Sequence, residues 1–141
     1  FAKENKLSFF DIRNQTGLLR NLIIRTSTTN ELMVLVQFFE NDIERINMLM
    51  EYIKKTFKKI TSLLYTINEK ANNTLYDQKI ICYNGKDHIN EKIGDLTFKI
   101  GPKSFFQTNS EQAVKLYTKA RELAQITKDD IVYDLIQGLE Q

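Results

Sequence analysis

The longest apolar run of the sequence covers residues 32–39 and is interrupted only by Gln37. A run of this length suits a strand and falls far short of the roughly 20 apolar residues that a membrane-spanning helix needs. The chain is 42% hydrophobic and 27% charged, which is enough apolar side chain to bury a core. The run therefore predicts a strand in a soluble globular protein.

A second segment of similar composition, residues 22–28, precedes this run, and the polar residues 27–30 connect the two. β-Branched and large apolar residues on both sides of a polar turn are typical of a hairpin. Residues 41–57 then carry apolar side chains at three- and four-residue spacing, which predicts an amphipathic helix with Asn41 as its N-cap and Glu44 as the reciprocal capping residue.

Four further strands are expected, at residues 60–68, 79–83, 87–93 and 96–100. Asn84-Gly85 and Gly94-Asp95 are turn signals between the later ones. Short turns between consecutive strands favour antiparallel pairing. Residues 1–106 are therefore predicted to form a central α+β domain, with one mostly antiparallel sheet and a helix packed on its face.

The pattern changes after Gly101-Pro102. Asn109 is expected to cap a second helix, with Gln112 at the capping-box position. An almost entirely apolar run, residues 131–135, follows and suits a strand of a parallel sheet that is buried on both faces. Residues 107–141 are therefore predicted to open a second domain.

Composition limits the chemistry of the chain. One cysteine and one histidine exclude an internal disulfide and argue against a four-ligand zinc site, so no metal is expected. The formal net charge is only +2, so contact with nucleic acid has to come from local basic clusters. The candidates are Arg13, Arg20 and Arg25 near the start and Lys54, Lys55, Lys58 and Lys59. For the lysines, the sequence favours a solvated helix end, where the helix dipole attracts cations.

Two segments carry a resemblance to a known family. One is Thr16-Gly17-Leu18-Leu19-Arg20-Asn21-Leu22-Ile23-Ile24-Arg25, and the other is Gly101-Pro102-Lys103-Ser104-Phe105-Phe106-Gln107-Thr108-Asn109, followed by Leu116-Tyr117 and residues 131–135. Together, and in this order, they resemble the S-adenosylmethionine-dependent RNA uracil-5-methyltransferases. The resemblance implies that residues 107–141 are the first helix and strand of a Rossmann-like methyltransferase domain.

The resemblance also implies site residues. Gln107 matches the glutamine that contacts S-adenosylmethionine, and it comes just before a helix N-terminus, which favours a carboxylate. Phe105 and Phe106 match residues at the edge of the RNA and cofactor cleft, and Arg20 and Arg25 lie on or beside the strand that faces RNA. The alternatives are core packing for the phenylalanines and a local backbone contact for Gln107.

The residues that perform this family's chemistry are missing from the sequence. The reaction needs a cysteine thiolate that adds to C6 of uracil, and a base that removes the C5 proton after methyl transfer. Cys82 lies in a predicted strand, where a buried thiol is inert, and His88 is expected at the surface. In the cofactor loop Gly138 fits the family pattern, whereas Ile136 and Glu140 replace an aromatic residue and a glycine. No catalytic residue is assigned.

The sequence thus predicts an internal fragment of an RNA methyltransferase that is inactive by itself. The implied partner is RNA, with 23S rRNA favoured over tRNA by analogy. Residues 1–11 lack the apolar stretch of a signal peptide, so a cytoplasmic location is expected. Two alternatives stay open: a non-catalytic RNA-binding α+β module, and a purely structural domain that binds nothing.

Overall fold

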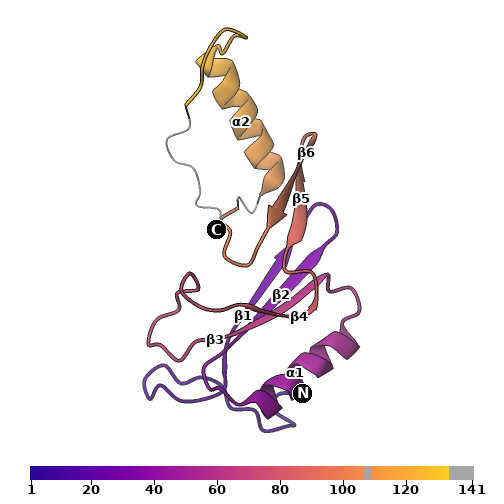
Figure 1. Cartoon of the computed structure of the whole chain (residues 1–141), viewed down its shortest axis with the longest axis vertical. Coiled ribbons are helices and arrows are strands. Elements are labelled where there is room, and N and C mark those ends of the chain that lie inside the picture. The colour runs from indigo at the N-terminus through magenta and orange to yellow at the C-terminus, as the bar shows by residue number, and fades with distance from the viewer. Residues whose placement is uncertain (107–108, 134–141) are drawn as a thin grey trace.

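The sheet at the centre of the structure has four strands. In the computed structural model, which describes residues 1–106 and 109–133, they run in the order β1-β2-β3-β4 (Figure 1). Their bounds are β1 Leu19–Thr26, β2 Leu32–Phe38, β3 Ser62–Ile67 and β4 Ile81–Gly85. β1 and β2 form the predicted hairpin, in which Ile23 pairs with Leu35.

Two of the three strand pairs in this sheet are antiparallel, as predicted, and the pairing of β2 with β3 is the exception. The helix α1 (Ile43–Thr56) connects the two strands, and they run parallel, with Leu35 opposite Leu64. A helix between two strands provides the crossover that parallel pairing requires. β5 (Ile89–Ile93) and β6 (Leu96–Ile100) form a separate two-stranded sheet. The α+β class is confirmed, but as a mixed sheet plus a hairpin.

β2 is covered on both faces because its side chains alternate between two hydrophobic clusters. On the face of α1, the buried residues are Leu7, Leu18, Val34, Val36, Phe38, Ile46, Met50, Leu63 and Tyr65. On the other face they are Met33, Leu35, Leu64, Ile89 and Ile100, so this cluster includes both strands of the β5–β6 hairpin. The sheet therefore lies between a helical layer and a hairpin layer.

Two carboxylates tie the hairpin layer to the β1–β2 turn. Glu91 is 3% exposed and accepts hydrogen bonds from the backbone N–H and the hydroxyl of Thr28. Glu31 accepts from Lys86 Nζ at 2.9 Å and from the backbone N–H of Asn90 at 2.5 Å. The bonds from Lys86 and from Asn90 hold the pKa of Glu31 below its usual range. The hairpin is thus fixed by charge-assisted hydrogen bonds as well as by burial.

Asp42, and not Asn41, caps α1. The Asp42 carboxylate accepts from the backbone N–H of Arg45 at 3.1 Å and also lies 3.2 Å from Arg45 Nε. Asparagine and aspartate cap helices about equally well, so the sequence pattern does not distinguish the two neighbours. The backbone of Asp42 has the extended conformation of a cap residue, and the helix starts one position after it.

Asn84-Gly85 was expected to form a turn, but both residues lie in β4. Gly85 has a φ of 83°, and a Cβ atom there would lie 2.1 Å from the backbone oxygen of Thr61. Glycine is needed here because the backbones of Gly85 and Thr61 lie too close together to leave room for a side chain. The chain does not reverse direction at this point. The second turn signal is confirmed, since Gly94 has a φ of 58° between β5 and β6.

The second helix, α2 (Ser110–Ala124), begins as predicted, with the Asn109 side chain accepting from the backbone N–H of Gln112 at 3.1 Å. Its first turn lies against β5, and Ala113 is buried. Beyond that point the predicted apolar stripe is exposed, with Leu123 at 74%. Figure 1 shows α2 extending beyond the β5–β6 hairpin. No helix of the described ranges combines the length and apolar character needed to span a membrane.

The predicted strand at residues 131–135 is not observed over its described part. Ile131, Val132 and Tyr133 lie outside any strand, with exposures of 64–79%. A strand needs a neighbour to satisfy its backbone groups, and these three residues pair with none of the strands that the structure describes. The last two residues of the run, with Ile136, Gly138 and Glu140, lie outside the described residues. The assignment of 107–141 to a methyltransferase domain stays a prediction.

Removing the α1 cap tests the corrected helix start. Asp42→Ala is expected to lower the free energy of unfolding by about 1 kcal/mol, because the Arg45 amide loses its acceptor. Asn41→Ala is the matched control and should change stability by less than about 0.5 kcal/mol. Urea unfolding followed by circular dichroism measures both. The reverse order of the two effects would contradict the assignment.

Candidate functional site

The side chain of Arg20 forms hydrogen bonds within the protein. Its guanidinium donates to the backbone oxygens of Asn68 (2.7 Å), Lys70 (2.5 Å) and Asn72 (2.8 Å) and to Asn73 Oδ1 (3.1 Å). The same group lies 4.6 Å from the centroid of the Phe10 ring and 5.6 Å from that of Phe39. Four of the donors that a guanidinium offers are therefore engaged. The side chain anchors the segment after β3, and its predicted contact with RNA stays a prediction.

A β-bulge places Arg20 in this position. Leu19 pairs with Phe38 and Asn21 pairs with Gln37, so Arg20 is the extra residue of the edge strand. A bulge interrupts the alternation of a strand and re-aims the side chain at that point. Just before it, Gly17 passes the backbone of Phe9 so closely that a Cβ atom would lie 2.3 Å from the Phe9 oxygen. The Thr16–Arg25 segment is thus shaped by backbone packing as well as by its arginines.

Arg25 anchors the turn that leads toward Gln107. Its Nη1 donates to the backbone oxygens of Ser104 at 2.9 Å and of Gly101 at 3.2 Å. Burial lowers the pKa of Arg25, as it does that of Arg20, but a guanidinium remains protonated at physiological pH. Arg25 therefore holds the Gly101–Ser104 turn against β1, and its predicted RNA contact also stays untested.

The two phenylalanines of the turn differ in environment. Phe106 packs against the cluster that contains Ile89 and Ile100, and its ring centroid lies 6.3 Å from that of Phe98. Phe105 is 83% exposed. Core packing therefore describes Phe106, whereas Phe105 is available to a ligand. Gln107 lies outside the described residues, so its cofactor contact stays a prediction.

Cys82 was expected to be buried, and it is exposed. β4 is the edge strand of the sheet, which leaves one of its sides without a covering neighbour. Partial desolvation of the thiol and the nearby charge of Asp87 both raise the pKa of Cys82, and its Sγ lies 3.6 Å from the Gly85 oxygen. The thiol therefore stays protonated near neutral pH. That Cys82 is not a nucleophile stays a prediction, now supported by its raised pKa and not by burial.

His88 lies 2.6 Å from the carboxylate of Asp87 through Nδ1 and contacts no candidate site residue through a hydrogen bond or ion pair within the described ranges. Residues 1–106 and 109–133 contain no group of three or more histidine, cysteine, aspartate or glutamate side chains placed to hold a metal ion.

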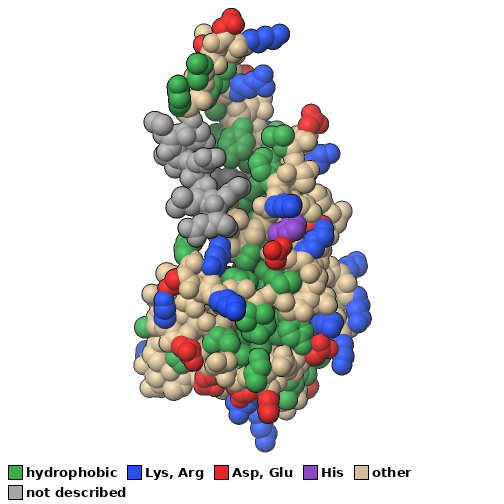
Figure 2. All heavy atoms as spheres, in the orientation of Figure 1, with side chains coloured by type: hydrophobic (Ala, Val, Ile, Leu, Met, Phe, Trp, Pro, Cys, Tyr) green, Lys and Arg blue, Asp and Glu red, His purple; other side chains and the backbone are tan. Residues whose placement is uncertain are grey.

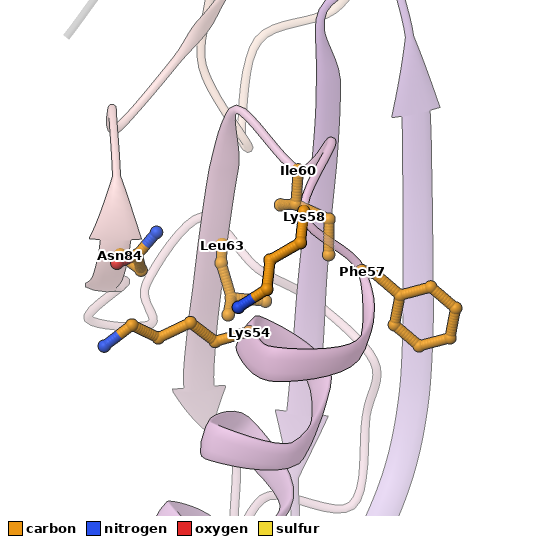
Figure 3. Close-up of a pocket in the computed structure, with 6 residues that line it drawn as sticks. All are labelled: Lys54, Phe57, Lys58, Ile60, Leu63 and Asn84. Atoms are coloured by element: carbon orange, nitrogen blue, oxygen red, sulfur yellow. The ribbon is translucent and has the colours of Figure 1, made fainter.

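A hollow that the sequence did not reveal lies at the C-terminal end of α1. It has a volume of about 200 Å³ and is lined by Lys54, Phe57, Lys58, Ile60, Leu63 and Asn84 (Figure 3). The lysines were noticed in the sequence, but Asn84 comes from β4, and only the folded sheet brings it beside the helix end. No local sequence signal connects these positions.

The chain is similar in sequence to proteins described as RNA methyltransferases. It is 52% identical over 130 residues to an uncharacterized RNA methyltransferase of Porphyromonas gingivalis, which covers 92% of the chain. It is 50% identical over 141 residues to another from Bacteroides thetaiotaomicron, which covers 98% of it. Over this segment, the chain is similar to both of these RNA methyltransferases. A Staphylococcus aureus relative with the same description is 36% identical over 138 residues, 97% of the chain.

The chain spans about a third of the length of these relatives: 28%, 31% and 30% of the three proteins. The structure is similar to that of the Pyrococcus abyssi tRNA (uracil-54, C5)-methyltransferase in complex with S-adenosyl-L-homocysteine. The TM-score is 0.66 at 30% identity, and the match covers 87% of this chain and 29% of that protein. No family model matches the chain.

The anchoring role of Arg20 can be tested by replacement with lysine, which keeps the charge but loses the planar fork of donors. Arg20→Lys is expected to destabilise the fold by about 2 kcal/mol, because several backbone oxygens lose their charged donor. Arg13→Lys, at an exposed position whose side chain forms no hydrogen bond within the described residues, is the control. Equal thermal unfolding of the two variants would contradict the anchoring role.

The reactivity of Cys82 tests the state of its thiol. Since its pKa is raised, a smaller fraction is thiolate at pH 7.5 than for a free cysteine. Iodoacetamide should therefore alkylate the folded chain more slowly than the same chain in urea, and the difference should shrink as the pH rises through the folded-state pKa. Faster alkylation of the folded chain would show an activated thiol.

Proposed function

We propose that this chain is the RNA-side segment of an S-adenosylmethionine-dependent methyltransferase that methylates C5 of a uridine in RNA. The observation that carries the proposal is the 30% identity and TM-score of 0.66 with a tRNA uracil-5-methyltransferase over 87% of the chain. Relatives described as RNA methyltransferases, 50–52% identical over nearly the whole chain, support the broader class.

In this proposal, residues 1–106 form the central domain and residues 107–141 open the methyltransferase domain. Arg25 fixes the Gly101–Ser104 turn, and the turn presents Phe105 to solvent. Gln107 is the proposed contact to the cofactor, which supplies the methyl group when bound. Arg20 keeps the segment after β3 in place beside β1, and any RNA contact of either arginine comes in addition to these internal bonds.

The described residues next to Gln107 supply only part of a cofactor site. At the start of α2, the side chain of Asn109 already satisfies the amide of Gln112, so that amide does not await a carboxylate. Glu111 in the first turn adds a negative charge. Most of the groups that bind the cofactor are therefore proposed to lie outside the described part of the chain, and no reaction step is assigned to these residues.

The chain by itself is proposed to be inactive. The chemistry requires a cysteine thiolate that attacks C6 of uracil, and the sequence has a single cysteine, Cys82. Its raised pKa keeps it protonated. This also favours the second candidate, a non-catalytic RNA-binding module, for the chain taken alone.

The proposal has two versions, which differ in whether the methylated RNA is 23S rRNA or tRNA. The sequence resemblance favours 23S rRNA, whereas the structural neighbour is described as acting on tRNA. Because the relatives name no particular RNA, both substrates belong in one assay.

Methyl transfer from labelled S-adenosylmethionine to RNA tests the proposal. The full-length protein encoded by the gene is expected to methylate a uridine in either 23S rRNA or tRNA transcripts, with 5-methyluridine identified by mass spectrometry. The 141-residue chain should transfer no label. In the full-length protein, Cys82→Ser should keep most of the activity, because Cys82 is not the nucleophile. Failure of the full-length protein to form 5-methyluridine would contradict the proposal, and activity of the short chain would contradict its inactivity.

A further inference from the structure

A cluster of four lysines within six residues surrounds the C-terminal end of α1: Lys54, Lys55, Lys58 and Lys59. The formal charge of the whole chain is only +2, so this short segment is far more basic than the rest of the protein. In Figure 2, blue side chains gather at the lower right, where Figure 1 draws the end of α1. The positive charge of these lysines is therefore concentrated on the surface at the C-terminal end of α1.

Acidic residues neutralise only part of this charge. Glu51 lies 3.2 Å from Lys54 Nζ and 3.9 Å from Lys55 Nζ, and it also accepts a hydrogen bond from the Tyr83 hydroxyl. Lys58 and Lys59 are exposed and form no ion pair within residues 1–106 and 109–133. The helix dipole favours lysines in the last turn of α1, but Lys58 and Lys59 come after that turn, so the dipole alone does not account for them.

The surface between these lysines is hollowed. Ile60 and Leu63 supply apolar wall, and Asn84 supplies a side-chain amide at the edge. Figure 3 shows Lys54 and Lys58 extending toward Asn84 and Leu63, while the ring of Phe57 points away from them past the helix end. The volume of about 200 Å³ is below the roughly 300–1,000 Å³ of small-molecule pockets. The hollow therefore suits part of a polymer better than a whole small ligand.

Phe57 adds an apolar surface to the basic one. Its side chain is 54% exposed, although the backbone N–H of the same residue is bonded to the Ile53 oxygen and completes the helix. Sites for single-stranded nucleic acid combine cations that meet the phosphates with aromatic rings on which bases stack. The segment that carries Lys54, Lys58 and Lys59 also carries this exposed ring.

We infer that the end of α1, formed by Lys54, Lys58, Lys59 and Phe57, is a second RNA-binding surface that holds backbone phosphates. The inference rests on the proposed function. This surface lies on the α1 face of the sheet, whereas Phe106 and the turn that Arg25 anchors lie with the hairpin cluster on the opposite face. It contributes affinity from the opposite face of the sheet to Phe106.

Salt-dependent binding tests the surface in the 141-residue chain. Affinity for a single-stranded RNA and for a tRNA transcript is measured between about 50 and 200 mM salt. Lys58→Gln combined with Lys59→Gln should reduce the slope of log affinity against log salt by about two, one for each lysine. The control is Lys115→Gln with Lys128→Gln, which removes the same charge from exposed positions on and after α2 and should leave the slope unchanged.

Phe57→Ala separates stacking from charge. It should weaken binding to the single-stranded RNA about tenfold and leave the salt slope as it was, with circular dichroism confirming that α1 is intact. An unchanged slope for the Lys58 and Lys59 variant, an equal effect of the control pair, or no RNA binding by the parent chain would overturn the inference. Binding to anionic phospholipid vesicles in place of RNA, lost in the same variant, would also overturn it.

The same variants in the full-length protein keep this inference distinct from the proposed function. The lysine variant should raise KM for RNA and leave kcat unchanged. A full-length protein that forms no 5-methyluridine would overturn the proposed function, whereas methylation with a KM that the lysine variant does not alter would overturn only the second surface.

Discussion

Burial of β2 on both faces is the constraint on which the rest of the structure depends. Every residue from Met33 to Phe38 is buried, so the strand needs a covering layer on each side, and α1 and the β5–β6 hairpin provide them. Even Gln37 is fully buried, and neither atom of its side-chain amide has a hydrogen-bond partner among the described residues. Burying an amide without hydrogen bonds costs free energy. The position of Gln37 in the central strand keeps it buried despite that cost.

Local sequence patterns predicted the elements better than their arrangement. The β1–β2 hairpin, both helices and the Gly94 turn follow from composition and spacing, since these signals act within a few residues. Parallel pairing of β2 and β3 depends on where α1 returns the chain, and Gly85 resembles a turn residue until its contact with Thr61 is seen. The missing strand at Ile131 shows the same limit, because a strand exists only where a partner is present.

The sequence also predicted some features of the candidate site and not others. The resemblance agrees with the description of the similar proteins as RNA methyltransferases, and it rests on ordered motifs such as the Thr16–Arg25 segment and the turn before Gln107. It did not predict what the arginines contact. Both point to backbone oxygens of the same chain, and this depends on loops that are 48 to 79 residues away in the sequence. The exposed state of Cys82 was missed for a related reason: a strand pattern does not tell an edge strand from an inner one.

The bulge at Arg20 has a consequence for how the edge strand is aligned. Arg20 and Arg25 are separated by five positions, an odd number, so in a regular strand their side chains would leave on opposite faces of the sheet. Yet both anchor segments that cover the same cluster, which includes Leu75 after the first anchor and Phe106 after the second. The extra residue changes the parity of β1. A regular strand that kept the five-position spacing would present its two arginines to different layers of the protein.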